Sequence, residues 1–323
     1  MRKGFFCILA CAFFLSSAAV RAADFEGPLH IRNSHPMFLA TGSPSLISAE
    51  PENALQLDFT YSSTYMLDRA QNWFFGIDLE AAVLEIGLKK KIGDSTELSL
   101  ELPLISYNSG FLDSPLASYH KAFGFADYGR SERPLNDFLF NVTRDGREVF
   151  QGKSGEIAPG DIKVGIKRAL TLKDPAISLQ AFANLPSGDP DRGYGSGRIN
   201  GGAALLLNKR LGSKVMAYLN AGYGLIDRIE AKESVSLRNY LYGGTGLEWA
   251  CSKKVLLNGQ VFFQQSPFRN TGVRDIDTMS SVLSFGGRYR LGGKSTLGFS
   301  FSEDPTTAGA PDFMVGFDYK YRF

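Results

Sequence analysis

Histidines are the first side chains to test for acid–base chemistry, because their charge changes near neutral pH. The sequence has three, and only His120 falls in the long connection 108–159. It could act as a base for a nearby hydroxyl or pair with a nearby carboxylate, the candidates being Ser118, Ser131, Asp113 and Asp127. No spacing in this stretch brings a nucleophile, an orienting acid and an oxyanion donor together. We therefore expect a protein that is not an enzyme, in which His120 packs in or caps a loop helix. A hydrolase that uses His120 is the alternative.

Other patterns that could bind a metal or a nucleotide are incomplete. The glycine-rich run 193–197 follows a predicted strand but opens no helix, so it lacks the context of a phosphate-binding loop. Asp189 and Asp191 could bind calcium, but their spacing departs from the EF-hand loop. Cys251 is the only cysteine outside the first 22 residues and so has no internal disulfide partner. We expect no cofactor and no metal.

Charged side chains form a second candidate set, because they lie on one face of segments whose other face is apolar. Side chains at even spacing lie on one face of a strand. Placing such charges in lipid is costly, so we expect this face to line an enclosed interior. The set comprises Glu97, Glu101, Lys163, Lys167, Glu248, Arg288 and Arg290. Its mixture of acids and bases predicts either a network of interior ion pairs or a ladder that selects a charged solute.

The segments that carry these charges have the alternation of β-strands. In the last segment, apolar residues at 313, 315, 317, 319, 321 and 323 alternate with Asp318, Lys320 and Arg322 on the other face. Twelve such segments occur: 54–66, 77–91, 95–107, 160–171, 175–186, 199–210, 213–227, 237–251, 254–266, 279–291, 294–303 and 313–323. Most are longer than the ~5–6 residues of soluble strands and could cross a membrane at a tilt.

The connections between these segments alternate in length. Five short turns, near residues 93, 173, 211, 252 and 292, alternate with six longer polar connections at 67–76, 108–159, 187–198, 228–236, 267–278 and 304–312. This sorting is typical of outer-membrane barrels, which have short periplasmic turns and longer external loops. A soluble β-sandwich has no reason to sort its loops. We therefore predict an all-β fold over 54–323, a transmembrane antiparallel up-and-down barrel of about twelve strands.

The N-terminus indicates secretion to the bacterial outer membrane. Residues 1–22 combine a basic start, an apolar stretch and small residues before Ala23, the layout of a signal peptide. The apolar stretch is too short for a membrane anchor, and cleavage at Cys11, as in a lipoprotein, would leave half of it behind. Without residues 1–22 the chain has 32 basic and 33 acidic residues. This near-neutral balance predicts no binding to nucleic acid.

Two segments stand outside the barrel pattern. Residues 23–53 contain four prolines that interrupt any strand, so they could form a periplasmic leader or a plug in the lumen. The connection 108–159 has the signals of a helix between Ser114 and Gly124 and of a hairpin around 144–147. We expect it outside the membrane as a lid or an inward-folded constriction, a gating loop that includes His120 and Arg130.

Several stretches resemble a family of Gram-negative outer-membrane β-barrel proteins known only as a domain of unknown function and similar to porins. They are residues 27–33 (GPLHIRN), 110–113 (GFLD), 119–124 (YHKAFG) and 160–165 (GDIKVG). Ala126 departs from the proline of the family pattern. Phe323, with aromatics at alternate positions before it, resembles the C-terminal signal that the barrel-assembly machinery recognises. The resemblance implies a location and an architecture, and it implies no activity.

These observations lead to one favoured function and two alternatives. We expect a passive or gated channel for the uptake of a small solute, in contact with outer-membrane lipid. The alternatives are the hydrolase that uses His120 and a structural or adhesive barrel.

Overall fold

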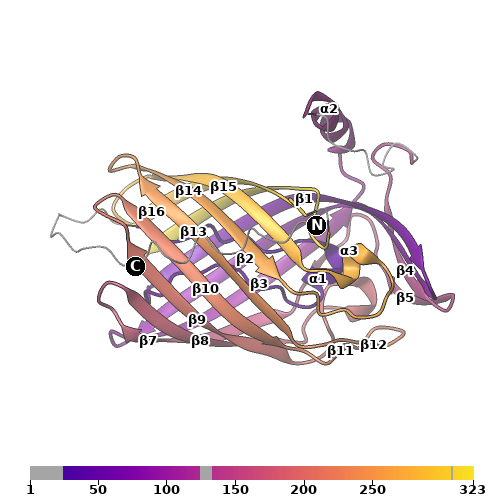
Figure 1. Ribbon diagram of the computed structural model, residues 1–323, viewed down its shortest axis with the longest axis horizontal. Helices are drawn as coiled ribbons and strands as arrows, with labels where there is room; N and C mark the ends of the chain where they lie inside the picture. The colour runs from indigo at the N-terminus through magenta and orange to yellow at the C-terminus, as the bar shows by residue number, and fades with distance from the viewer. Residues whose placement is uncertain (1–24, 124–132, 307) are drawn as a thin grey trace, which may run out of the picture.

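The computed structural model describes residues 25–123, 133–306 and 308–323, except for the side chains of residues 119, 120, 122 and 123. Twelve antiparallel strands close into a barrel because β1 pairs with both β2 and β17 (Figure 1). They are β1 (Ala54–Ala70), β2 (Trp73–Ile92), β3 (Thr96–Asn108), β7 (Ile162–Thr171), β8 (Ala176–Leu185), β9 (Asn200–Arg210), β10 (Val215–Leu225), β13 (Tyr240–Ala250), β14 (Val255–Gln264), β15 (Ser280–Arg290), β16 (Ser295–Glu303) and β17 (Phe313–Arg322). The predicted fold class and the predicted number of strands are confirmed.

Alternation along the strands separates an apolar outward face from a polar inward face. On β3, Leu98 and Leu100 are 46% and 45% exposed, whereas Glu97 and Glu101 are 3% and 8% exposed. Phe285 on β15 and Phe317 on β17 are likewise exposed on the outside. An outward apolar band around a polar interior is the side-chain arrangement of barrels that stand in lipid. No helix in the described ranges is long and apolar enough to span a bilayer.

The two ends of the barrel differ in their connections. At one end, which we call the turn end, short turns join β2 to β3, β7 to β8, β9 to β10, β13 to β14 and β15 to β16. Longer connections gather at the other, which we call the loop end. The predicted loop 67–76 is wrong, because β1 and β2 continue to Ala70 and Trp73 and are joined by Gln71 and Asn72 alone. Beyond the apolar band a strand can carry exposed Asp68 and Arg69, so its polar composition resembles that of a loop.

The connection 108–159 contains a wall hairpin as well as a loop. β2 pairs with β3 up to Glu80 and then with β4 (Leu139–Arg144), so β4 continues the line of β3. The chain returns through β5 (Arg147–Gln151) and β6 (Ile157–Pro159), which precede β7. The hairpin predicted around 144–147 is therefore present, and it extends the barrel wall at the loop end.

The rest of this connection, residues 109–138, is an insertion that leaves the wall between β3 and β4. It carries α2 (Asp113–Phe123), the helix predicted in this stretch, which projects from the barrel at the upper right of Figure 1. Glu80 on the outward face of β2 accepts hydrogen bonds from the backbone N–H groups of Phe111 (2.9 Å) and Leu112 (2.5 Å). Asp78 pairs with Arg133 at 2.7 Å. Over its described residues, the insertion is thus held against the outside of the wall.

Candidate luminal site

Residues 25–53, which we call the luminal segment, run through the barrel from the turn end to the loop end and back. Near the turn end Glu26 pairs with Arg290, and at the loop end Asn33 donates to the carbonyl oxygen of Gly309 (2.5 Å). On the return, Glu52 reaches Lys89 near the turn end of β2. The four prolines of the segment remove backbone donors and prevent a regular strand, so its path stays irregular.

Side-chain amides of the wall form hydrogen bonds with backbone N–H and C=O groups of the luminal segment. Gln260 accepts from the N–H of Leu29 (2.9 Å) and donates to its carbonyl oxygen (3.0 Å). Asn220 does the same for Ile47, at 2.8 and 3.0 Å. Buried backbone groups need such partners, and here the inward polar face of the barrel provides them in place of a strand ladder.

The apex of the luminal segment is a short apolar helix at the loop end. α1 (Pro36–Leu39) is capped by the His35 ring, which accepts from the N–H of Met37. Phe38 is fully buried, and its ring meets that of Phe268 edge to face with centroids 6.0 Å apart. Apolar side chains from the wall and the external connections surround this helix, so the loop-end half of the interior has an apolar core.

The turn-end half of the interior is charged. The Glu26 carboxylate lies 3.0 Å from Arg290 Nε and 2.7 Å from Arg322 Nη1. Glu52 lies 2.9 Å from Lys89 Nζ and 3.3 Å from Lys320 Nζ. The acids of the luminal segment therefore occupy a cluster of wall cations near the strand ends.

All seven charged residues predicted to line the lumen have side chains directed inward. Arg288 pairs with Asp318 (3.1 Å) and donates to the carbonyl oxygens of Gly27 and Pro28. Glu248 accepts from the N–H groups of Glu26 and Gly27 (2.9 and 3.1 Å). The remaining contacts join Lys167 to Glu97 (3.0 Å), Lys163 to Glu101 (3.9 Å) and Arg290 to Glu26. Their part in choosing a solute stays a prediction.

Sequence reasoning missed a second charged cluster deeper in the lumen. His30 Nδ1 lies 3.1 Å from Asp58 Oδ2 and 3.2 Å from Glu85 Oε1. Arg32 pairs with Glu85 at 3.1 Å and also with Glu101. Alternation along β1 and β2 could have placed Asp58 and Glu85 on the inward face. The two cations belong to an irregular segment, in which no periodicity indicates where a side chain points.

The spacing of this cluster invites comparison with a metal site. Ligand atoms of His30, Glu85 and Glu101 all lie within 4.8 Å of one another. However, the guanidinium of Arg32 pairs with both carboxylates. A cation of the chain therefore already stands between the two acids, and the arrangement is that of an ion-pair network.

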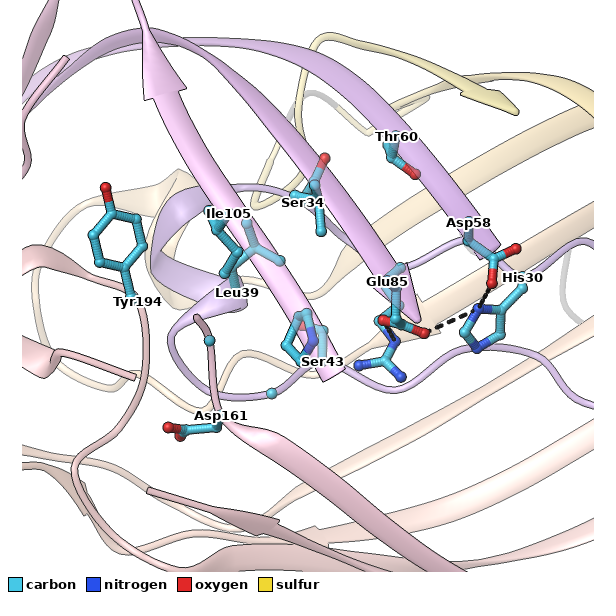
Figure 2. Close-up of a pocket in the computed structure, with 15 residues that line it drawn as sticks. His30, Ser34, Leu39, Ser43, Asp58, Thr60, Glu85, Ile105, Asp161 and Tyr194 are labelled. Carbon is cyan, nitrogen blue, oxygen red and sulfur yellow. Dashed lines mark hydrogen bonds and ion pairs between the residues drawn. The ribbon is translucent and has the colours of Figure 1, made fainter. Parts of the chain in front are cut away.

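A cavity opens between the luminal segment and the wall beside this cluster (Figure 2). Its water-accessible volume is about 40 Å³. His30, Arg32, Asp58 and Glu85 line one end, and Leu39, Val83, Pro103 and Ile105 contribute apolar walls. Ser34, Asp161 and Tyr194 also line it. The cavity therefore joins the charged half of the interior to the apolar half.

Asp161 fixes the wall of this cavity at the start of β7. Its carboxylate accepts from the N–H of Gly188 (3.1 Å) and from the N–H (2.9 Å) and hydroxyl (3.1 Å) of Ser196. Burial raises the pKa of Asp161 above its ordinary value, and the hydrogen bonds from Ser196 and Gly188 act in the opposite direction. The same loop places Tyr194 against Tyr107, with ring centroids 5.2 Å apart.

The remaining predicted site residues lie away from the lumen or outside the residues and side chains that the structure describes. Arg130 and the predicted signal peptide fall outside the described residues, as does the side chain of His120 in α2. Phe323 follows β17 at the turn end and is 46% exposed, with Lys90 Nζ 5.3 Å from its ring centroid. Its part in barrel assembly stays a prediction.

Solved structures with similar folds are outer-membrane channels and porins. The COG4313 outer membrane channel from Pseudomonas putida F1 has a TM-score of 0.57 at 12% identity, over 84% of this chain and 96% of that one. The NanC porin has a TM-score of 0.48 at 8% identity, over 83% and 98% of the two chains. The toluene transporter TbuX from Ralstonia pickettii has a TM-score of 0.41 at 10% identity, over 84% and 90%. At 12% identity the likeness to the COG4313 channel concerns the fold.

The sequence comparisons agree with the expected resemblance to an uncharacterised family. No curated protein matches this sequence. The model of the family described as "Protein of unknown function (DUF3187)" matches residues 5–323, almost the whole chain. The chain therefore belongs to the DUF3187 family.

Proposed function

We propose that this protein is a gated channel for a small solute in the bacterial outer membrane, with the luminal segment as its gate. The observation that carries the proposal is that reversible polar contacts hold this segment to the wall. Gln260, Asn220 and Glu248 bind its backbone, and charged pairs bind its side chains. A permanently sealed scaffold could fill its interior with apolar side chains alone.

The energetics of the charged contacts favour a gate that can open and close again. A buried ion pair gains Coulomb energy but loses the hydration of two ions, so its net contribution is close to zero. If the luminal segment moves, water can hydrate Arg290, Arg322 and Lys320 on the wall and Glu26 on the segment. The wall stays intact during such a movement because the strand ladders close it without the segment.

The outward surface supports the proposed location. Exposed apolar residues such as Leu98, Phe285 and Phe317 surround the wall and would contact lipid. The resemblance of the last strand to an assembly signal adds the barrel-assembly machinery as a proposed partner. The loop lengths support an orientation with the turn end in the periplasm.

Deletion of residues 25–50 tests the channel. The deletion precedes β1 and leaves all twelve strands, so the variant should fold into the same barrel with a hydrated lumen. In planar bilayers we expect the variant to conduct continuously and the intact protein to open rarely. Heat-modifiable migration on electrophoresis checks that both are folded. A folded deletion variant that conducts no more than the intact protein would show that the luminal segment is not the gate.

A further inference from the structure

We propose that the cavity beside the luminal segment binds a small primary ammonium compound with an apolar body. This inference names the solute class for the proposed channel and so rests on the proposed function. It begins from buried polar atoms that lack a hydrogen bond. Within the described residues, the buried hydroxyls of Ser34 and Tyr194 have no hydrogen bond, and the Oε1 atom of Glu85 has only its ion pair with His30 (3.2 Å); all three residues line this cavity.

All three residues are buried, so polar atoms without a hydrogen bond need a physical explanation here. Ser34 and Tyr194 are 2% and 1% exposed, and Glu85 is 5% exposed. Buried polar atoms are normally paired, and an unpaired one marks bound water, a ligand or a strained site. Three such atoms along one cavity indicate that the cavity holds an occupant with hydrogen-bonding capacity.

The sign of the charge follows from the acids in the lining. Asp58, Glu85 and Asp161 line the cavity with Arg32 as the single permanent cation, and His30 adds at most one more. Arg32 also divides its charge between Glu85 and Glu101. Acids therefore exceed cations in the lining in either protonation state of His30. A cationic occupant is favoured over an anionic one.

The positions of the donors make an N–H group more suitable than a metal ion or a quaternary cation. His30 Nδ1 carries at most one proton, which the hydrogen bond to Asp58 uses. Glu85 Oε1 lies 3.2 Å from the same nitrogen but receives no hydrogen bond from it. An ammonium group has three N–H donors, enough for Glu85 and for a hydroxyl such as that of Ser34.

The rest of the lining suits a hydrocarbon body. Leu39 comes from the luminal segment, and Val83, Pro103 and Ile105 come from β2 and β3. Small-molecule sites commonly combine apolar walls with a few fixed polar groups. Because Leu39 belongs to the proposed gate, an occupant would contact the gate and the wall at once.

Ligand-observed NMR on the folded, detergent-solubilised protein tests the inference with four probes. They are butylammonium, tetramethylammonium, butyrate and 1-butanol. We expect butylammonium to bind at least tenfold more tightly than each of the other three. Equal binding of butyrate would overturn the charge argument, and equal binding of tetramethylammonium would overturn the hydrogen-bond argument. If no probe binds, water alone fills the cavity and the inference fails.

Three variants locate the binding. Glu85→Gln should weaken butylammonium binding at least tenfold, and comparison in the same detergent removes the contribution of the micelle. Glu80→Gln is the matched control, since Glu80 lies on the outward face of the same strand, and it should leave binding unchanged. Tyr194→Phe removes an unpartnered hydroxyl, so it should weaken binding about threefold without lowering the melting temperature.

These measurements are independent of conduction. A deletion variant that conducts while the intact protein binds no butylammonium would leave the channel standing and refute the solute class. Binding that survives both Glu85→Gln and Tyr194→Phe would place the ligand elsewhere and also refute the inference.

Discussion

The two halves of the barrel interior hold the luminal segment by different forces. At the loop end, α1 is buried among apolar side chains, with Phe38 against Phe268. At the turn end, Glu26 and Glu52 lie among wall cations. Salt does not screen apolar contacts, and their contribution is lost only when the helix leaves its site. Ion pairs are screened by salt, and water or dissolved ions can replace either partner. We infer that the apex keeps the channel closed and that the turn end sets the position of the segment.

The largest effect should come from the apex. Phe38→Ala removes a fully buried ring, and truncations of this kind cost about 3–5 kcal/mol. We expect the luminal segment to undock much more often, which would appear as frequent opening in bilayer recordings and faster amide exchange over residues 26–50. The amides of the barrel strands should keep their protection, because the ladders do not involve Phe38. Unchanged exchange over the segment would show that α1 is not the anchor.

A smaller effect should follow from breaking one charged contact at the turn-end side. Arg288→Met leaves Asp318, whose side chain is 10% exposed, without its partner and removes the donors to Gly27 and Pro28, a loss of about 3 kcal/mol. Part of this loss falls on the wall, so the segment should open less often than in Phe38→Ala.

The double variant Arg288→Met with Asp318→Leu separates the two contributions. Removing both charges should restore most of the unfolding stability, while the segment still lacks its two carbonyl partners. Amide exchange near residues 27–28 should therefore stay fast. A double variant no more stable than Arg288→Met would contradict the view that an unpaired buried charge causes the loss.

The smallest effect should come from salt. Glu26 is buried but its partner Arg322 is partly exposed, and the exposure of Arg322 limits the contribution of this pair to about 1 kcal/mol. In 1 M salt, where the screening length is about 3 Å, amide exchange near Glu26 and Glu52 should accelerate by less than about tenfold. Exchange over α1 should not accelerate. An equal acceleration at both ends would remove the distinction between the two halves.

The barrel could be predicted from the sequence because each strand of a wall between lipid and a polar interior must alternate apolar and polar side chains. That period gave the twelve strands and the inward direction of Glu97, Lys167 and Arg288. The prediction by alternation failed beyond the apolar band, where lipid no longer requires an apolar outward face. The hairpin at 67–76 therefore had the polar composition of a loop. Alternation also could not place His30 and Arg32, because their contacts with Asp58, Glu85 and Glu101 depend on the irregular path of the luminal segment through the closed barrel.

A reversible tether between the apex and the wall tests the gate most directly. Asn33 Nδ2 lies 3.4 Å from Ser280 Oγ at the loop end, so cysteines placed there, Asn33→Cys with Ser280→Cys in a Cys251→Ser background, can be joined through the two disulfides of a short bis-methanethiosulfonate bridge that ties segment to wall. We predict that the bridged protein stays closed in planar bilayers, and that a reductant restores the openings seen in the Cys251→Ser background alone. Equal conductance in the bridged and reduced states, with the bridge confirmed by mass spectrometry, would contradict the account.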